Sequence, residues 1–261
     1  MSNPYYDHDG ITIYHGDCRD VLPLISDVQT VFTSPPYNTL GARIPENASG
    51  IWAKSNGMRG FVRNVNSQGY ADDMDETEYQ SQQVAIVDAL AVTLMAGGSL
   101  FYNHKCRWRD GLLVHPVLWM RPSALLLREE IIWDRSGSMT FNARMFAPSD
   151  ERILWFTKPG ARHRWNQPSG EALLSIWRIH PEEGARKPHP VSFPILLPMR
   201  AIVATTDYGE TILDPFMGSG TTLRAAKNLG RRAIGIEIEE RYCEIAARRM
   251  EQEVLPLEGK P

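Results

Sequence analysis

Short apolar runs alternate along this chain with longer segments in which apolar residues recur at helical spacing. The runs that predict strands are 11–14, 30–33, 99–102, 131–133, 153–156, 211–213 and 233–236. The segments that predict helices are 78–95, 221–229 and 239–253. This order predicts an α/β fold, in which a mostly parallel sheet carries helices on both faces and 131–133 and 153–156 form an antiparallel pair.

Two stretches interrupt the pattern. Residues 38–69 are rich in Gly, Asn and Ser and predict a long loop, which in an enzyme is usually functional. Residues 158–187 hold several Pro and Gly, two tryptophans, and six basic residues against three acidic ones. We expect a single domain over 1–261, with the loop at 38–69 and an insertion at 158–186. Basic residues mixed with aromatic ones suit a nucleic-acid face, although a solvated insertion has the same composition.

Composition narrows the class of protein. The chain has 261 residues, of which 43% are hydrophobic and 23% charged, as in ordinary globular proteins. No apolar run reaches the roughly 18 residues of a membrane span, and the polar N-terminus does not resemble a signal peptide. Three distant cysteines predict neither a disulfide framework nor a zinc site, so we expect a cytoplasmic protein without membrane or metal partners. The net charge of −3 leaves a DNA partner open without indicating one.

A glycine turn follows the predicted strand 211–213. Gly218 and Gly220 allow a tight turn that opens a helix, whose N-terminus favours an anionic group. The third glycine of a dinucleotide fingerprint is replaced by Leu223, and the lysine of a P-loop is missing, so NAD and ATP are disfavoured. Glu237 ends the next strand, 17 residues past Gly220, where a carboxylate can bind two ribose hydroxyls. S-adenosylmethionine combines a ribose with a small anionic end, although a plain turn would also need these glycines.

The run Ser34-Pro35-Pro36-Tyr37 closes the strand 30–33 at the carboxyl edge of the predicted sheet. Two prolines fix the backbone and remove two N–H donors, so the turn presents mainly hydrogen-bond acceptors. An exocyclic amine of a nucleobase is a poor nucleophile because its lone pair is delocalised. Acceptors at Ser34 and the Pro35 carbonyl would localise that lone pair, and the Tyr37 ring would stack on the base. A structural Pro-Pro turn is the alternative for these four residues alone.

Together the two motifs resemble those of the DNA amino-methyltransferases, and their order is the permuted order of the β group. The resemblance implies a Rossmann-like S-adenosylmethionine-dependent methyltransferase fold, circularly permuted in its motifs. It implies that Ser34, Pro35, Pro36 and Tyr37 are catalytic. The cofactor-binding residues that it implies are Asp17, Asp214, Phe216, Gly218, Gly220, Thr221, Thr222, Glu237, Lys187, His189 and Pro190.

The predicted reaction is methyl transfer from S-adenosylmethionine to an exocyclic amine of a flipped-out base in duplex DNA, as in restriction–modification. In this family serine before Pro-Pro-Tyr generally goes with cytosine N4 and aspartate with adenine N6, so Ser34 favours cytosine and leaves adenine as the alternative. A nucleic-acid-binding module with a vestigial cofactor pocket, or an enzyme for RNA or protein glutamine, also fits. Arg162, Arg164 and Trp165 are the predicted DNA contacts. Many members of the family form homodimers.

Overall fold

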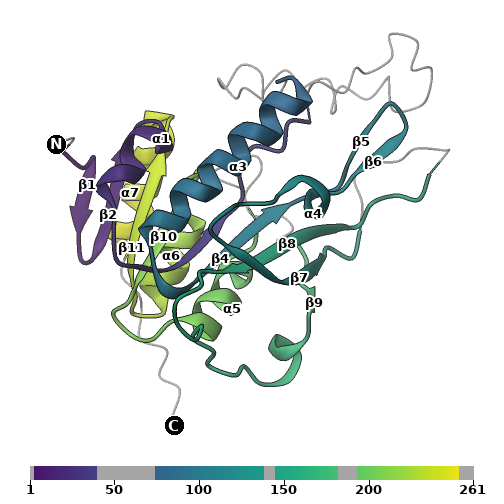
Figure 1. The fold of residues 1–261 in the computed structure, drawn as a ribbon. Coiled ribbons are helices and arrows are strands. Elements are labelled where there is room, and N and C mark those ends of the chain that lie inside the picture. The colour runs from purple at the N-terminus through teal and green to yellow at the C-terminus, as the bar shows by residue number, and fades with distance from the viewer. Residues whose placement is uncertain (1–2, 40–73, 138–144, 182–192, 253–261) are drawn as a thin grey trace.

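The computed structural model describes residues 3–39, 74–137, 145–181 and 193–252, and Figure 1 shows them as one sheet flanked by helices. The strands are β1 (Tyr6–His8), β2 (Ile11–His15), β3 (Val28–Thr33), β4 (Leu94–His104), β5 (Arg107–Arg109), β6 (Leu112–Val114), β7 (Leu126–Asp134), β8 (Asp150–Thr157), β9 (Ile176–Arg178), β10 (Thr211–Asp214) and β11 (Arg232–Glu237). The α-helices are α1 (Cys18–Val21), α3 (Glu76–Thr93), α4 (Pro116–Trp119), α5 (Leu196–Thr205), α6 (Thr221–Asn228) and α7 (Glu240–Glu251), with 3-10 helices η1 (Leu22–Leu24) and η2 (Gly170–Leu173).

Nine strands form the main sheet in the order β1-β2-β11-β10-β3-β4-β8-β7-β9. The five strands from β2 to β4 in this order are parallel to one another, which confirms the predicted parallel core. β8 runs antiparallel to both β4 and β7, so the predicted antiparallel pair is also confirmed. β9 adds a short parallel strand at the far edge, beside β7.

Helices cover both faces of the sheet (Figure 1). On one face, α1, η1 and α3 contribute to a core that includes Leu90 and the sheet residue Phe156. On the other face, α5, α6 and α7 pack Ile202, Leu223 and Ala246 against the sheet. The parallel strands are almost fully buried because both of their faces are covered, which explains their nearly continuous apolar sequence.

The boundary between α3 and β4 differs from the prediction. The helix was predicted over 78–95 and the strand over 99–102, but the helix ends at Thr93 and the strand begins at Leu94. Gly97 and Gly98 therefore lie within β4. Gly97 has a φ of +76°, and a methyl group there would lie 2.7 Å from the carbonyl oxygen of Arg162. The lack of a side chain at Gly97 therefore lets the backbone of β4 approach the backbone at Arg162 closely, which a local sequence pattern does not reveal.

The order of the strands reverses between β3 and β10. β3 continues through α3 to β4 on one side, whereas β10 continues through α6 to β11 on the other, and the two helices cover opposite faces. In α/β sheets the carboxyl ends of two such strands border a crevice that binds ligands. The Ser34–Tyr37 and Asp214–Thr222 motifs follow these two strands, so the fold brings both motifs to this crevice.

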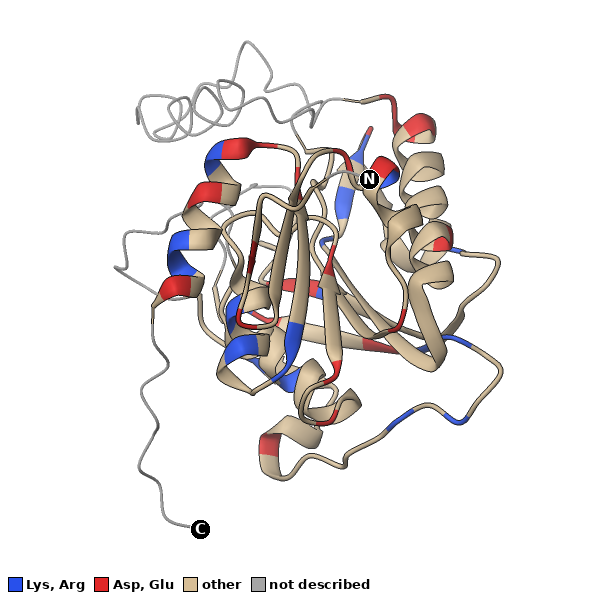
Figure 2. Cartoon of the chain, turned by 90° about the vertical axis from the view of Figure 1, so that its left-hand side faces the viewer, with Lys and Arg blue, Asp and Glu red and all other residues tan. Residues whose placement is uncertain are grey.

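Figure 2 shows Lys and Arg interspersed with Asp and Glu over the described elements. No helix in the described part of the chain is long and apolar enough to cross a membrane. Within the same ranges, no three His, Cys, Asp or Glu side chains are grouped as metal ligands would be.

Candidate active site

Ser34 and Tyr37 lie side by side at the carboxyl end of β3. The two hydroxyl oxygens are 2.6 Å apart, because the Pro35-Pro36 turn folds the tyrosine back over the serine. The ring of Tyr37 lies against His104 at a centroid distance of 4.8 Å, and the Lys105 amino group is 5.6 Å from the ring centroid. Burial, and next the charge of Glu151, raise the pKa of Tyr37 well above its usual value, so its hydroxyl keeps its proton.

A buried amide and an ion pair support these two hydroxyls. Tyr37 donates to Glu151 Oε2 at 3.0 Å, and Asn103 Nδ2 lies 2.7 Å from the Tyr37 oxygen and 3.0 Å from Glu151 Oε2. On the far side, Arg135 Nη1 donates to Glu151 Oε1 at 3.1 Å, which compensates the charge of this nearly buried carboxylate. Strands β3, β4 and β8 thus contribute to one polar network.

Two further buried side chains, Tyr79 and His104, hold the carbonyl of Pro36 in place. Tyr79 of α3 lies 2.6 Å from this carbonyl oxygen and 2.8 Å from His104 Nε2. His104 Nδ1 contacts the Lys105 carbonyl, which can only accept, so Nδ1 carries the proton. Burial, followed by the charge of Arg107, lowers the pKa of His104 to about 3, so the ring is neutral at physiological pH. These contacts fix the orientation of the Pro-Pro turn.

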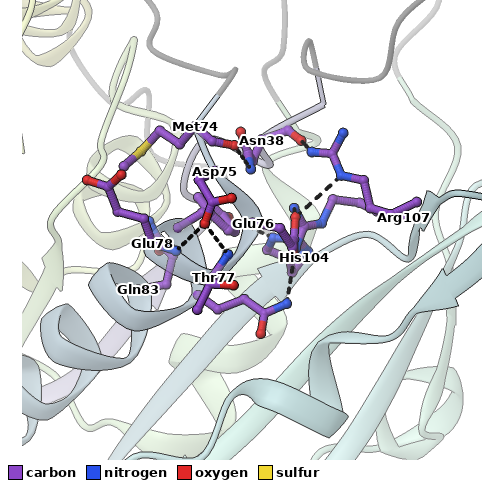
Figure 3. A network of polar contacts seen from close by, with 12 residues as sticks. Asn38, Met74, Asp75, Glu76, Thr77, Glu78, Gln83, His104 and Arg107 are labelled. Atoms are coloured by element: carbon purple, nitrogen blue, oxygen red, sulfur yellow. Dashed lines mark hydrogen bonds and ion pairs between the residues drawn. The ribbon is translucent and has the colours of Figure 1, made fainter.

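The residue after the motif is also anchored, as Figure 3 shows. Asn38 has a φ of +54°, and its side chain donates to the carbonyl of Met74 just before α3. Its own carbonyl accepts a short hydrogen bond of 2.5 Å from Arg109. Arg107 forms a two-point ion pair with Glu76, at 2.6 and 2.8 Å. The start of α3 and the strand β5 therefore clamp the end of the motif.

Asp214 links the two predicted motifs. Its Oδ1 accepts from Thr33 at 2.8 Å and from the Phe216 amide at 3.1 Å, while its Oδ2 accepts from Thr222 at 2.7 Å. The carboxyl group is 1% exposed, and this burial raises its pKa to about 6. These three hydrogen bonds position the turn in this structure, and cofactor binding by Asp214 stays a prediction.

The glycine turn has the predicted backbone. Gly218 and Gly220 have φ values of +51° and +79°, in the left-handed region that side chains disfavour. Gly220 begins α6, and a methyl group there would lie 3.0 Å from the Cβ of Ala246 on α7. The first amides of α6 have no partner within the helix, so they can bind an anionic group.

Glu237 lies at the end of β11, opposite this turn. Its Oε2 accepts from the Gly218 amide and its Oε1 from the Glu239 amide, both at 2.9 Å. Burial raises its pKa, although these amide hydrogen bonds act in the opposite direction. Each carboxylate oxygen retains acceptor capacity, so a ribose diol can still bind here.

The remaining predicted cofactor residues have different outcomes. Asp17 caps α1, and its carboxylate forms an ion pair with Arg19 at 2.5 Å. The preceding residue, Gly16, donates to the Glu237 carbonyl, so Asp17 lies beside the end of β11. Phe216 is partly exposed in the glycine turn, and Thr221 and Thr222 are buried in the first turn of α6. Lys187, His189 and Pro190 lie outside the described residues. The left-handed turn, the amides of α6 and the Glu237 carboxylate together fit S-adenosylmethionine.

The three predicted DNA contacts lie at the end of the sheet opposite the catalytic motif. Arg162 approaches Gly97 near the amino end of β4, while Arg164 pairs with Asp207 and with Glu210, just before β10 begins. Trp165 stacks on Trp155 at 5.4 Å. The basic composition of 158–186 suggested a DNA face, but antiparallel β8 carries the chain away from the catalytic motif before these residues occur.

Among the residues of the site that were not predicted from the sequence are Tyr79, Asn103, His104, Arg135 and Glu151. Two signals could have identified three of them. Asn103 and His104 are polar residues that directly follow the buried run 99–102, at the carboxyl end of a parallel strand. Glu151 begins a strand that was predicted to be antiparallel, and such a strand starts at the edge where its parallel neighbours end.

Comparison with known proteins agrees with this geometry. A family model described as DNA methylase, for the N6 and N4 enzymes, matches residues 28–248. The type II methyltransferase M2.DpnII of Streptococcus pneumoniae is 27% identical over 277 residues, covering 97% of this chain and 94% of its own length.

Two solved structures have the same fold. The PvuII DNA methyltransferase (cytosine-N4-specific) gives a TM-score of 0.70 at 18% identity, covering 97% of this chain and 90% of that one. The M1.HpyAVI–SAM complex gives a TM-score of 0.64 at 22% identity, covering 93% and 100%.

The chain therefore belongs to the N6/N4 DNA methylase family. It is an S-adenosylmethionine-dependent DNA amino-methyltransferase, acting on the N6 amine of adenine or the N4 amine of cytosine. When bound, S-adenosylmethionine supplies an activated methyl group. The fold brings the motifs predicted to hold the acceptor amine and the cofactor to neighbouring strand ends, an arrangement that would favour direct transfer by positioning.

Proposed function

We propose that this enzyme methylates the N4 amine of a cytosine that has been flipped out of duplex DNA. The observation that carries the proposal is the Ser34 hydroxyl in the first position of the motif, where the family generally has serine for cytosine and aspartate for adenine. This hydroxyl and the Pro35 carbonyl are acceptors for the amine hydrogens. Flipping costs a few kcal/mol, and stacking on the Tyr37 ring offsets about 1–3 kcal/mol of it.

Adenine N6 is the second candidate, and one contact favours it. Tyr37 connects Ser34 to the Glu151 carboxylate through hydrogen bonds of 2.6 and 3.0 Å. A carboxylate therefore acts on Ser34 through one intervening hydroxyl, which gives this site part of the character that an aspartate would provide.

The proposed DNA face is the carboxyl edge of the sheet, where the motif lies. Arg178 ends β9 at this edge, is well exposed, and lies 3.5 Å from Asp134 in a solvent-screened ion pair. The hairpin β5–β6 follows β4 at the same edge and exposes Leu112 and Leu113. Since M2.DpnII is named a type II methyltransferase, we also propose that this enzyme modifies a specific DNA sequence in such a system.

Mass spectrometry of nucleosides tests the proposed base. The enzyme is expressed in a host that lacks adenine and cytosine DNA methylation, with the empty vector and the Tyr37→Ala variant as controls. We expect 4-methylcytosine with the wild type and background levels in both controls. Finding 6-methyladenine without 4-methylcytosine would replace cytosine by adenine and leave the rest of the site unchanged.

A further inference from the structure

The hydroxyls of Ser34 and Tyr37 and the carboxylate of Glu151 form a continuous line of hydrogen bonds at the active site. The successive distances are 2.6 Å from Ser34 Oγ to the Tyr37 oxygen and 3.0 Å from that oxygen to Glu151 Oε2. The line begins at the motif that receives the amine and ends at a carboxylate of β8 that is 7% exposed.

The direction of each hydrogen bond follows from the donors that are available. An ionised carboxylate can only accept, so the single proton of Tyr37 is donated to Glu151. The Asn103 side chain lies 3.0 Å from the same carboxylate oxygen, which needs a donor, so the NH₂ group of Asn103 faces the network. This NH₂ group also donates to the Tyr37 oxygen at 2.7 Å. The remaining contact at 2.6 Å must then be a donation from Ser34 to Tyr37.

This ordering determines what Ser34 presents to a substrate. Its one proton points inward to Tyr37, and Asn103 Nδ2 also donates to its oxygen at 3.3 Å. The remaining acceptor capacity of Ser34 is a lone pair, which a base can use. A free serine hydroxyl could donate or accept. In this site Ser34 is an acceptor for the hydrogens of an exocyclic amine, and the Glu151 carboxylate, two hydrogen bonds away, keeps it in that state.

We infer that Ser34, Tyr37 and Glu151 form a proton relay that removes the amine proton during methyl transfer. The bond from the amine nitrogen to the methyl carbon forms as the bond from that carbon to the sulfonium sulfur breaks, and the electron pair of the broken bond stays on sulfur. The amine proton passes to Ser34, the Ser34 proton to Tyr37, and the Tyr37 proton to Glu151 Oε2. The products are the methylated amine, neutral S-adenosylhomocysteine and a protonated Glu151.

Tyr37 therefore has a role beyond stacking on the base, and Glu151 is a positioning residue that acts through Tyr37. Arg135 Nη1, at 3.1 Å from Glu151 Oε1, pairs with the far side of this carboxylate. The relay serves an exocyclic amine of either base, so its test does not depend on whether cytosine or adenine is the target.

The test compares Tyr37→Phe, Glu151→Gln and the double variant with the wild type. Tyr37→Phe keeps the ring and removes the hydroxyl, while Glu151→Gln keeps the shape and removes the charge. Asp150→Asn is the matched control, because Asp150 precedes Glu151 on β8 and pairs instead with Arg152. Single-turnover methylation of unmethylated plasmid DNA is measured in H₂O and in D₂O, together with the affinity for S-adenosylhomocysteine and the melting temperature.

Both single variants are expected to methylate about 10- to 100-fold more slowly. General acid–base catalysis typically contributes about 100- to 10,000-fold, so the expected loss lies at or below the lower end of that range. The double variant should be no slower than the slower single variant, since both changes interrupt one relay. The wild type should be slower in D₂O, and Tyr37→Phe should lose that difference. Affinity for S-adenosylhomocysteine should match that of Asp150→Asn in both single variants. The melting temperature should match for Tyr37→Phe, whereas Glu151→Gln should melt lower because Arg135 loses its charged partner.

Three results would overturn the relay. The first is a Glu151→Gln enzyme that retains at least half of the wild-type rate. The second is a rate loss in Tyr37→Phe that comes with an equal loss of cofactor affinity or a lowered melting temperature, which would indicate a structural role. The third is a wild-type rate that is the same in H₂O and D₂O, which would show that no proton moves as the methyl group is transferred.

Discussion

Asp214 connects the two halves of the active site, and its burial makes the stability of the enzyme depend on pH. Because its pKa is raised to about 6 in the folded protein, the folded state binds this proton more tightly than the unfolded chain does. The stabilisation is complete below about pH 4 and is lost as the pH rises to about 6. A shift of about two pKa units corresponds to roughly 3 kcal/mol.

Asp214→Asn should remove this dependence, because the amide stays neutral at every pH. We expect the free energy of unfolding of the wild type, relative to the variant, to fall by up to about 3 kcal/mol between pH 4 and pH 7. Urea unfolding at several pH values measures the difference and cancels the other titrating groups. A constant difference across this range would show that Asp214 ionises normally in the folded protein.

At Glu237 the expected effect is on cofactor binding. Glu237→Gln places an NH₂ group opposite the amide of Gly218 or Glu239, both of which also donate. We expect S-adenosylmethionine to bind about 1–3 kcal/mol more weakly, the usual cost of losing hydrogen bonds to a charged acceptor. Calorimetry measures this affinity. Glu239→Gln is the control, and equal affinity in both variants would remove the ribose-binding role.

Among the elements, the turn between β10 and α6 is the most constrained. Gly220 and Gly209 have nearly the same φ, +79° and +77°, but only Gly220 has a close neighbour, the Cβ of Ala246 at 3.0 Å. Gly209→Ala therefore measures the cost of a left-handed alanine, about 1–2 kcal/mol. Gly220→Ala adds the displacement of α7 from the turn.

We expect Gly220→Ala to lower the melting temperature more than Gly209→Ala does. It should also lose the rise in melting temperature that S-adenosylhomocysteine gives the wild type, whereas Gly209→Ala should keep it. Both quantities come from one thermal-shift experiment with and without the ligand. If the two variants behave alike, the contact of α6 with α7 does not determine the shape of the cofactor turn.

At the scale of the whole molecule, the proposed DNA face follows from the direction of the strands. Arg162 and Arg178 are both exposed and belong to the same basic segment, but they lie at opposite edges of the sheet. Each phosphate contact releases counterions and contributes about 0.9 to the slope of log affinity against log salt.

Arg178→Ala should therefore lower that slope by about one, and Arg162→Ala should leave it unchanged. Fluorescence anisotropy of a labelled duplex, titrated at several salt concentrations, gives both slopes with the same protein preparation. A reduced slope for Arg162→Ala alone would return the DNA face to the amino edge of the sheet.

The sequence by itself determined the five strands of the parallel core, the helices α3, α6 and α7, the tight glycine turn and the rigid Pro-Pro turn. Helix α5, which also covers the sheet, was not predicted. The predicted features are local: burial on both faces makes strands continuously apolar, and left-handed or proline-fixed backbones require particular residues. The resemblance of both motifs to those of a known family then indicated the chemistry. Each motif is short and contiguous, so it can be recognised in the sequence without knowledge of the fold.

Only the tertiary structure decided which distant residues meet. Glu151 and Asn103 reach Tyr37 because β8 runs antiparallel beside β4, and the sequence places them at the same end of the sheet without showing that contact. Asp214 joins the two motifs through three hydrogen bonds, which connect residues far apart in the chain. Arg164, a predicted DNA contact, forms an ion pair with Glu210 at the end of the sheet opposite the catalytic motif. Composition records which charges are present, whereas strand direction decides where they lie.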